Sequence, residues 1–266
     1  MEFRTVVDIP KPAFQIEPCE RILLVGSCFA DSIGQRLKED KFQVMVNPFG
    51  VMYNPVSILH TIERIDKIPR IVFLTLGTNH VYRLKETGEI VDNCEKRPAV
   101  LFQEEVLTTE ECADYLRKAV ELLKERNPEV QIVMTVSPIR YRKYGYHESQ
   151  LSKSTLLLAA DMVSRESSTT HYFPAYEIVN DELRDYRFYA ADMVHPSAQA
   201  VDYVWERLSE NYFSEATKRF LTEWQPVKQA LHHKPFHPDS EEYKVFMDKT
   251  MLKVEALRKK YSNFVL

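Results

Sequence analysis

Ile22-Leu23-Leu24-Val25-Gly26-Ser27-Cys28-Phe29-Ala30 is the stretch that decides the fold of this chain. Its apolar start predicts a buried strand, Gly26 and Ser27 predict a tight turn, and a helix is expected over about 31–39. A strand that passes through a short turn into a helix is the typical opening of a βαβ unit. In an open α/β sheet, ligands bind where such strands end, so Ser27 is expected at the edge where chemistry takes place.

Short apolar runs alternate with helical segments over the first two hundred residues. Strands are predicted at 22–25, 43–46, 71–76, 130–136 and 171–178, and helices at 31–39, 55–65, 109–126, 149–164 and 196–211. This alternation is typical of a parallel sheet with helices on both faces, and right-handed crossovers favour the flavodoxin-like strand order. We therefore expect an α/β fold, a flavodoxin-like three-layer α/β/α sandwich with a five-stranded parallel sheet.

Two stretches depart from this pattern. Residues 81–100 contain Glu86-Thr87-Gly88-Glu89 between two apolar runs, which predicts a small hairpin insertion. The tail from 213 to 266 contains a turn-rich segment and then a long helix over about 240–261. We expect a domain over 1–212 and a helical C-terminal extension over 213–266. The extension either packs on the domain or pairs with a second chain, which would make a homo-oligomer.

Composition excludes several function classes. Net charge is −4, and no apolar run approaches the roughly 20 residues that span a bilayer, so neither a nucleic-acid partner nor a membrane is expected. The first residues show no signal peptide, which predicts a cytoplasmic protein. The four cysteines, Cys19, Cys28, Cys94 and Cys112, and the group His232, His233 and His237 lack zinc-ligand spacing. No metal and no cofactor is expected.

Three residues that are far apart in the sequence, Ser27 on one side and Asp192 and His195 on the other, suggest a single site for nucleophilic catalysis. A serine hydroxyl becomes a nucleophile when a base removes its proton, and His195 is the candidate base for Ser27. Asp192, three residues before His195, would orient the imidazole and stabilise its charged form. Each residue also has a simpler explanation: Ser27 as a helix cap, His195 as a helix-start residue before Pro196, and Asp192 as a loop residue.

Two further loops follow predicted strands and carry possible oxyanion donors. Gly50, in Asn47-Pro48-Phe49-Gly50, would present a backbone N–H, and Asn79, in Leu76-Gly77-Thr78-Asn79-His80, would present an amide. With the Ser27 N–H they would stabilise a tetrahedral intermediate. The alternatives are an ordinary turn glycine and a loop-capping amide.

These blocks resemble a known family. The order Gly26-Ser27, Gly50, Gly77-x-Asn79 and Asp192-x-x-His195 is similar to the four blocks of the SGNH (GDSL-like) hydrolases, and Gly26-Ser27-Cys28-Phe29-Ala30 resembles the signature of the GSCFA family. The segments Tyr53-Asn54-Pro55, Ser137-Pro138-Ile139-Arg140 and Val194-His195-Pro196-Ser197 also resemble that family. The resemblance implies a serine-dependent site with Ser27 as nucleophile, Gly50 and Asn79 as oxyanion donors, and Asp192 with His195 as the base pair.

The chain departs from the common form of that superfamily at Cys28 and His80. Cys28 is a competing nucleophile, because a helix N-terminus favours the thiolate. Adjacent residues point in different directions, however, so we expect Ser27 to face His195 and Cys28 to pack as a small buried hydrophobe.

The predicted function is a serine-dependent acyl or acetyl esterase acting on a small-molecule or carbohydrate ester. His80, Asn54, Arg140 and His147 are the candidate substrate-binding residues, because they lie near the predicted carboxyl ends of strands. The alternatives are an acyltransferase at the same site, a carbohydrate-binding protein with vestigial catalysis, and a thiol enzyme that uses Cys28.

Overall fold

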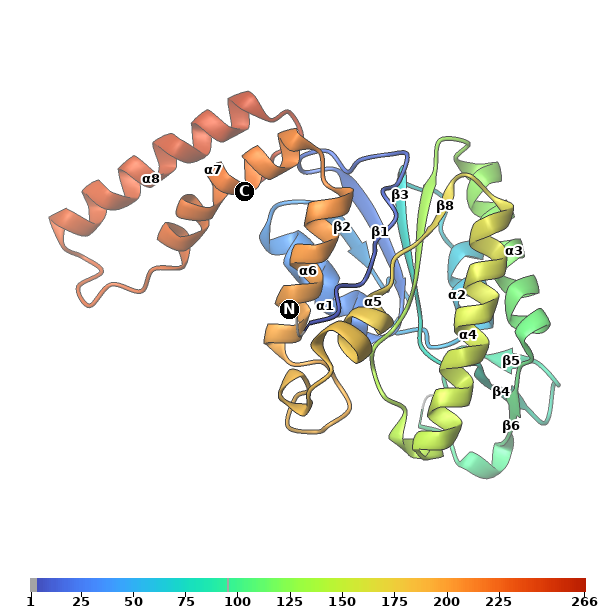
Figure 1. The fold of residues 1–266 in the computed structure, drawn as a ribbon. Helices are drawn as coiled ribbons and strands as arrows, with labels where there is room; N and C mark the ends of the chain where they lie inside the picture. Colours follow the sequence, from blue (N-terminus) through green and yellow to red (C-terminus); the bar gives the residue numbers. More distant parts are fainter. Residues whose placement is uncertain (1–3, 95) are drawn as a thin grey trace.

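The computed structural model describes residues 4–94 and 96–266, and its centre is a five-stranded parallel sheet. The strands are β1 Arg21–Gly26, β2 Gln43–Val46, β3 Ile71–Leu76, β7 Gln131–Val136 and β8 Thr170–Tyr172. They pair in the order β2-β1-β3-β7-β8, all parallel (Figure 1). Numbered along the chain, these five strands have the order 2-1-3-4-5, so the predicted flavodoxin-like arrangement is confirmed.

Alternating side chains of the strands build two separate cores. Along β1, Leu23 and Val25 face one core, and Ile22 and Leu24 face the other. The first core is covered by α2 Pro55–Glu63, α3 Thr109–Arg126 and α4 Tyr146–Glu166. The second is covered by α1 Cys28–Glu39, the short α5 Ala175–Glu177 with the π-helix Ile178–Leu183, and α6 Ala198–Tyr212. The predicted three layers are therefore present.

The start of α3 shows how local sequence sets a helix boundary. The Thr108 side chain accepts from the Glu111 N–H at 3.3 Å, and the Glu111 carboxylate accepts from the Thr108 N–H at 2.8 Å. This reciprocal pair is a capping box, which satisfies two N–H groups that have no partner inside the helix. The predicted bounds 109–126 agree with α3.

The insertion after β3 is a small antiparallel sheet. The predicted hairpin is formed by β4 His80–Leu84 and β5 Ile90–Val91, which pair antiparallel. A third strand, β6 Phe102–Val106, pairs along the other edge of β4 and was not predicted. Its exposed Glu104 and the few apolar residues in β6 hid the alternation on which strand prediction depends. A short 3-10 turn, Ala99–Leu101, leads into β6.

The predicted strand over 171–178 is wrong beyond its first residues. Strand β8 ends at Tyr172, and residues 175–183 are helical. Pro174 explains the difference, because it lacks an N–H for a sheet ladder and has a fixed φ that suits a helix start. The apolar residues that suggested a strand, Ile178 and Val179, are buried by the helical segment instead.

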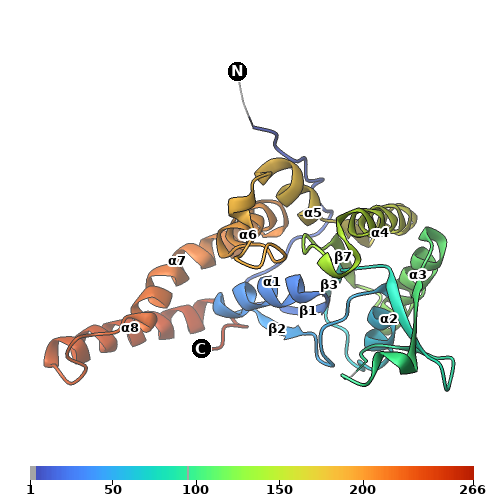
Figure 2. The same cartoon turned by 90° about the horizontal axis from the view of Figure 1, so that it is seen from below.

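The C-terminal extension is a helical hairpin. It contains α7 Glu215–His232 and α8 Glu241–Lys260, and it projects from the body of the molecule (Figures 1 and 2). The predicted long helix is α8, whereas α7 was missed because Pro226 lies inside it. The indole of Trp224 donates to the Glu39 carbonyl at 3.1 Å, which attaches α7 to the end of α1.

No helix in the described residues is long and apolar enough to cross a membrane. The division of the chain near residue 213 stays a prediction.

Candidate active site

The turn after β1 requires glycine at position 26. Gly26 has φ +141°, and a Cβ built there would lie 2.1 Å from the Thr75 carbonyl oxygen. Only a residue without a side chain allows β1 and β3 to approach so closely at this point. The turn lies at the carboxyl edge of the sheet, the lower edge in Figure 1, which Figure 2 shows face on.

Ser27 is completely buried in this turn. Its N–H donates to the Thr75 carbonyl at 3.0 Å and to the Thr75 hydroxyl at 2.9 Å. Its Oγ lies 3.2 Å from that hydroxyl and accepts from the Phe29 N–H at 3.3 Å, which makes Ser27 the N-cap of α1. The hydroxyl that was predicted to be the nucleophile therefore joins β1 to β3 and caps a helix.

Cys28 is partly buried and packs against the second core, so the expectation that it packs as a small buried hydrophobe holds only in part. Its Sγ lies 3.8 Å from the Tyr53 hydroxyl. Cys28 is the first residue of α1, and its Sγ contacts Tyr53 whereas the Ser27 Oγ contacts Thr75, so the two side chains leave the turn in different directions. Of the two adjacent nucleophiles, the thiol is the one that reaches the surface.

Asp192 and His195 form the predicted pair. The His195 Nδ1 lies 2.6 Å from the Asp192 Oδ2, while the Asp192 Oδ1 accepts from the N–H groups of Val194 at 2.9 Å and His195 at 3.0 Å. These donors, first the His195 backbone and then its ring, lower the pKa of Asp192 to about 2. The carboxylate therefore stays charged at neutral pH and holds the ring by Nδ1, which leaves Nε2 as the nitrogen that can exchange a proton.

Arg140 holds the loop that carries this pair. Its N–H donates to the Val194 carbonyl at 3.0 Å, and its Nη1 donates to the Met193 carbonyl at 3.2 Å. Its guanidinium lies 4.2 Å from the centre of the Tyr146 ring. Arg140 was predicted to bind substrate, but in the structure it attaches the His195 loop to the residues that follow β7. Among residues 4–94 and 96–266, no hydrogen bond joins His195 to Ser27 or Cys28.

The predicted oxyanion donors have other partners. The Gly50 N–H donates to the Asn47 carbonyl at 2.9 Å and closes a turn. The Asn79 side-chain amide is buried and donates to the Leu107 carbonyl at 2.7 Å, which ties the loop to the end of β6. The simpler explanations of a turn glycine and a loop-capping amide describe both residues.

A cavity of about 380 Å³ lies at this edge, between the small antiparallel sheet and the residues after β7. It is lined by Tyr53, Asn54, Thr78, His80, Tyr82, Val91, Asp92, Asn93, Cys94, Tyr141, Lys143 and Tyr144. Tyr53, whose hydroxyl contacts Cys28, connects the cavity to the turn. Two predicted substrate-binding residues, Asn54 and His80, thus lie in its wall.

Each of these two residues also has a structural role. The Asn54 Oδ1 accepts from the Ser57 N–H at 2.9 Å and caps α2. The His80 ring stacks on Tyr144 at 3.7 Å between centroids, and its Nδ1 lies 3.2 Å from the Glu104 carboxylate. Burial lowers the pKa of His80 and outweighs the opposing effect of Glu104. Burial therefore favours the neutral form of the His80 ring in the cavity wall.

His147 does not line the cavity; it is exposed in the first turn of α4. Within the described part of the chain, no group of three or more His, Cys, Asp or Glu side chains is placed to hold a metal ion.

Sequence reasoning missed Lys153. Its side chain is buried, and its Nζ donates to the Gly77 carbonyl at 2.7 Å and lies 5.0 Å from the centre of the Tyr141 ring. Burial alone lowers the pKa of Lys153 to about 7. The available signal was its place on the buried stripe of α4, three residues before Leu156. Lys153 supports the loop after β3 from inside the molecule.

The fold and the edge site define an α/β protein of the doubly wound class with its polar residues gathered at the carboxyl ends of the strands. The chain belongs to the GSCFA family: the family model matches residues 21–69 and 66–208, and the model of the GSCFA domain protein, C-terminal domain, matches residues 224–266.

Several solved structures are similar in fold. One, described as a platelet activating factor from Streptococcus pneumonia, has 14% identity and a TM-score of 0.49, and the match covers 74% of this chain and 85% of that one. A GDSL-like lipase from Parabacteroides merdae has 19% identity and a TM-score of 0.45, with 76% and 99% covered. A GDSL-family lipolytic protein from Veillonella parvula has 14% identity and a TM-score of 0.45, with 71% and 96% covered. No curated protein sequence matches the chain.

Proposed function

We propose that this chain is an ester-cleaving acyl hydrolase that forms a covalent intermediate on the turn after β1. The observation that carries the proposal is that a partly exposed nucleophile at a helix N-terminus, Cys28, and a His195–Asp192 pair lie at the same edge of the sheet without touching each other. A nucleophile, a base and a group that orients the base are the parts required for nucleophilic catalysis. The resemblance to SGNH hydrolases supports the same reaction class.

We assign the nucleophile to Cys28 rather than to Ser27, which revises the expectation from sequence. Ser27 is buried, and its hydroxyl is occupied by Thr75 and by the cap of α1. The Cys28 sulfur reaches the surface beside Tyr53, a residue of the cavity wall. The cavity would hold the acyl group or the alcohol of the substrate.

The proposed course is an acyl transfer in two halves. His195 Nε2 takes the proton of the Cys28 thiol as the sulfur attacks the ester carbonyl carbon, and it returns that proton to the departing alcohol. Water then attacks the thioester, His195 takes a proton from this water, and the acid leaves as the thiol is restored. The N-terminal end of α1 carries partial positive charge, which stabilises negative charge on the sulfur and on the carbonyl oxygen. The Cys28 N–H, at the first helix position, has no partner four residues earlier and is the proposed oxyanion donor.

This course requires His195 to approach Cys28 when substrate binds. Asp192 and Met193 are exposed, so this movement would break few buried contacts, but it has to carry along or break the two hydrogen bonds from Arg140 to the loop. Hydrogen bonds between catalytic groups are often long without substrate and tighten in the complex.

The test is chemical labelling of both candidate nucleophiles in the full chain. Iodoacetamide and a fluorophosphonate probe are applied separately, and the modified residue is located by peptide mass spectrometry. We expect Cys28 to alkylate faster than Cys94, a partly buried thiol in the cavity wall that serves as the control. His195→Ala should slow Cys28 and leave Cys94 unchanged. Turnover of a p-nitrophenyl ester should fall on the order of 10³-fold or more in Cys28→Ala.

The other outcomes identify the alternatives. A fluorophosphonate adduct on Ser27 that depends on His195, with turnover retained in Cys28→Ala, would assign the serine as nucleophile. Equal reactivity of Cys28 and Cys94, with no acyl-enzyme from any ester, would contradict an enzyme and favour a binding protein. Faster breakdown of the acyl-enzyme on addition of a polyol would assign a transferase.

A further inference from the structure

The helix α8 has an apolar face that none of the described residues, 4–94 and 96–266, covers. Thr250, Val254 and Leu257 are buried against α7. Leu252 lies two residues from both Thr250 and Val254, which places it on the opposite face, and Val245 lies seven residues, or two turns, before it. Val245 is 49% exposed and Leu252 is 72% exposed. Residues seven apart with apolar side chains are typical of a seam between helices.

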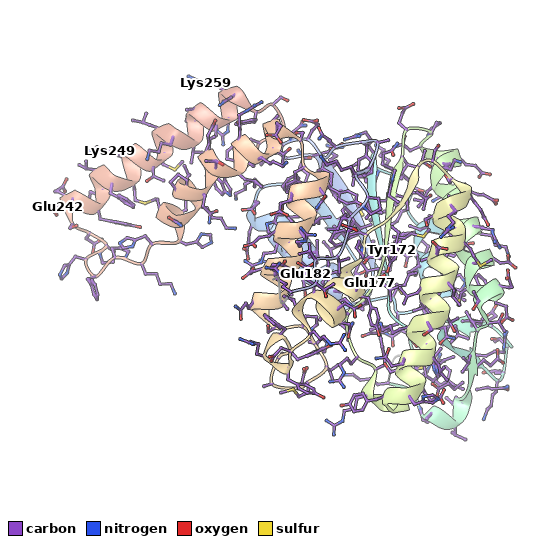
Figure 3. The ribbon with its side chains drawn as sticks, viewed as in Figure 1. Tyr172, Glu177, Glu182, Glu242, Lys249 and Lys259 are labelled. Atoms are coloured by element: carbon purple, nitrogen blue, oxygen red, sulfur yellow. The ribbon has the colours of Figure 1, made fainter. Side chains whose placement is uncertain are left out.

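The charges of α8 are arranged in opposite blocks along the helix. Glu241 and Glu242 lie in the first turn, and Arg258, Lys259 and Lys260 lie in the last turn. Figure 3 labels Glu242 and Lys259 at the two ends of α8, with Lys249 between them. Within the described residues, Glu242, Lys249 and Lys259 form no ion pair, so their charges remain available to a partner.

We propose that two copies of this chain pair through the outer faces of α8, antiparallel and related by a two-fold axis. In this arrangement the acidic first turn of each helix meets the basic last turn of the other, so one pattern of charges serves both contacts. If the axis passes between Thr250 and Met251, Glu242 opposes Lys259, Val245 opposes Ala256, and Leu252 opposes Lys249. The methylene stem of Lys249 then covers Leu252 while its ammonium reaches water.

A second copy is the occupant that the helix fits best, because its face is complementary to itself when reversed. The body of the molecule leaves room for such a partner, since the hairpin projects away from the sheet and its helices (Figures 1 and 2). A 20-residue helix is about 30 Å long, so pairing along its whole length places both charge blocks and both apolar residues in one interface.

The first experiment is sedimentation equilibrium of the full chain with Leu252→Glu as the test variant. The wild type is expected to be a dimer at micromolar concentration, and Leu252→Glu is expected to be a monomer with an unchanged circular dichroism spectrum. Leu158→Glu is the matched control, because Leu158 is 58% exposed on α4, away from the proposed interface. A monomeric wild type at about 100 µM, or a dimer that survives Leu252→Glu, would overturn the proposal.

The second experiment tests the antiparallel register with charge reversals. Glu242→Lys and Lys259→Glu should each weaken the homodimer several-fold, because each creates two like-charged contacts. An equimolar mixture of the two variants should restore a dimer, because every contact in the mixed pair again joins opposite charges. Effects of the reversals on the helix macrodipole would act within each chain and would not be rescued by mixing. A mixture that binds no better than either variant alone would overturn the register.

Discussion

The turn at Gly26–Cys28 and the loop at Asp192–His195 are the two halves of the candidate site, and they are built in opposite ways. The turn is held by contacts distant in sequence, since Ser27 and Gly26 pack directly against Thr75 of β3. The Asp192–His195 pair is held by residues of its own loop, since Asp192 accepts from two N–H groups within three positions, and Arg140 attaches that loop to the residues after β7. One half is rigid and buried, and the other is exposed. Changes at Gly26 and Ser27 should therefore affect folding, and changes at Cys28 and in the loop should affect reactivity.

Gly26→Ala should produce the largest loss of stability, and a mild loss would contradict the close packing of this turn. A Cβ at this position would collide with the backbone of β3, and the positive φ adds strain. We expect the free energy of unfolding to fall by about 3 kcal/mol or more, measured by urea denaturation. The control is Gly88→Ala, where φ is +74° but the space is open, and where the expected cost is about 1 kcal/mol.

Ser27→Ala and Cys28→Ala sharpen the contrast between two adjacent residues. Ser27→Ala removes the cap of α1 and leaves the Thr75 hydroxyl without that partner. The free energy of unfolding should therefore fall by about 1–2 kcal/mol. Cys28→Ala should change stability by less than about 0.5 kcal/mol, because the thiol is half-exposed. Ester turnover should show the reverse order, with a large loss in Cys28→Ala and a smaller one in Ser27→Ala. Equal stabilities would contradict the structural role of Ser27.

Lys153 supports the loop after β3 from inside the molecule. Because its pKa is about 7, the free energy of unfolding should depend on pH. Tyr141 and Tyr176 are the titratable groups whose rings face the Lys153 ammonium. Between pH 7 and 10.5 the unfolded chain binds more protons at this lysine than the folded one, so stability rises with pH. Below pH 7 the lysine is charged in both the folded and the unfolded chain, so burial of that charge lowers the free energy of unfolding by its full amount. Wild type should gain up to about 1.4 kcal/mol per pH unit relative to Lys153→Met, measured by denaturation from pH 6 to 10. A parallel profile for both proteins would show that Lys153 does not titrate there.

Asp192→Asn should have the smallest effect on folding and a clear effect on reactivity. The carboxylate is exposed, so the melting temperature should stay unchanged. The asparagine amide would hold the His195 ring less well and favour the wrong tautomer, so Cys28 alkylation should slow about 10-fold at pH 7. Cys94 in the same sample provides the reference rate. A large drop in melting temperature would show that the loop, like the turn, contributes to the stability of the fold.

Much of this architecture was predictable because its signals are local. The bounds of β3 and α3 follow from a continuous apolar run and a capping box, and both agree with the prediction. The third strand of the insertion and the helix α7 were missed because their sequences lack such signals. A strand predicted through Pro174 was wrong because apolar residues alone do not separate a buried strand from a buried helix.

In the site, the Asp192–His195 pair could be predicted from local sequence, because the two residues are three positions apart in one short loop, which brings the carboxylate to the imidazole. The start of a helix at Ser27 and Cys28 is also a local feature. Which of these two side chains reaches the surface depends on long-range packing, because the pairing of β1 with β3 places Thr75 against Ser27 and leaves Cys28 beside Tyr53. The same holds for Asn79 and Lys153, whose partners Leu107 and Gly77 are distant in sequence. The direction of a side chain at a turn depends on what packs beneath it, and no local pattern records that packing.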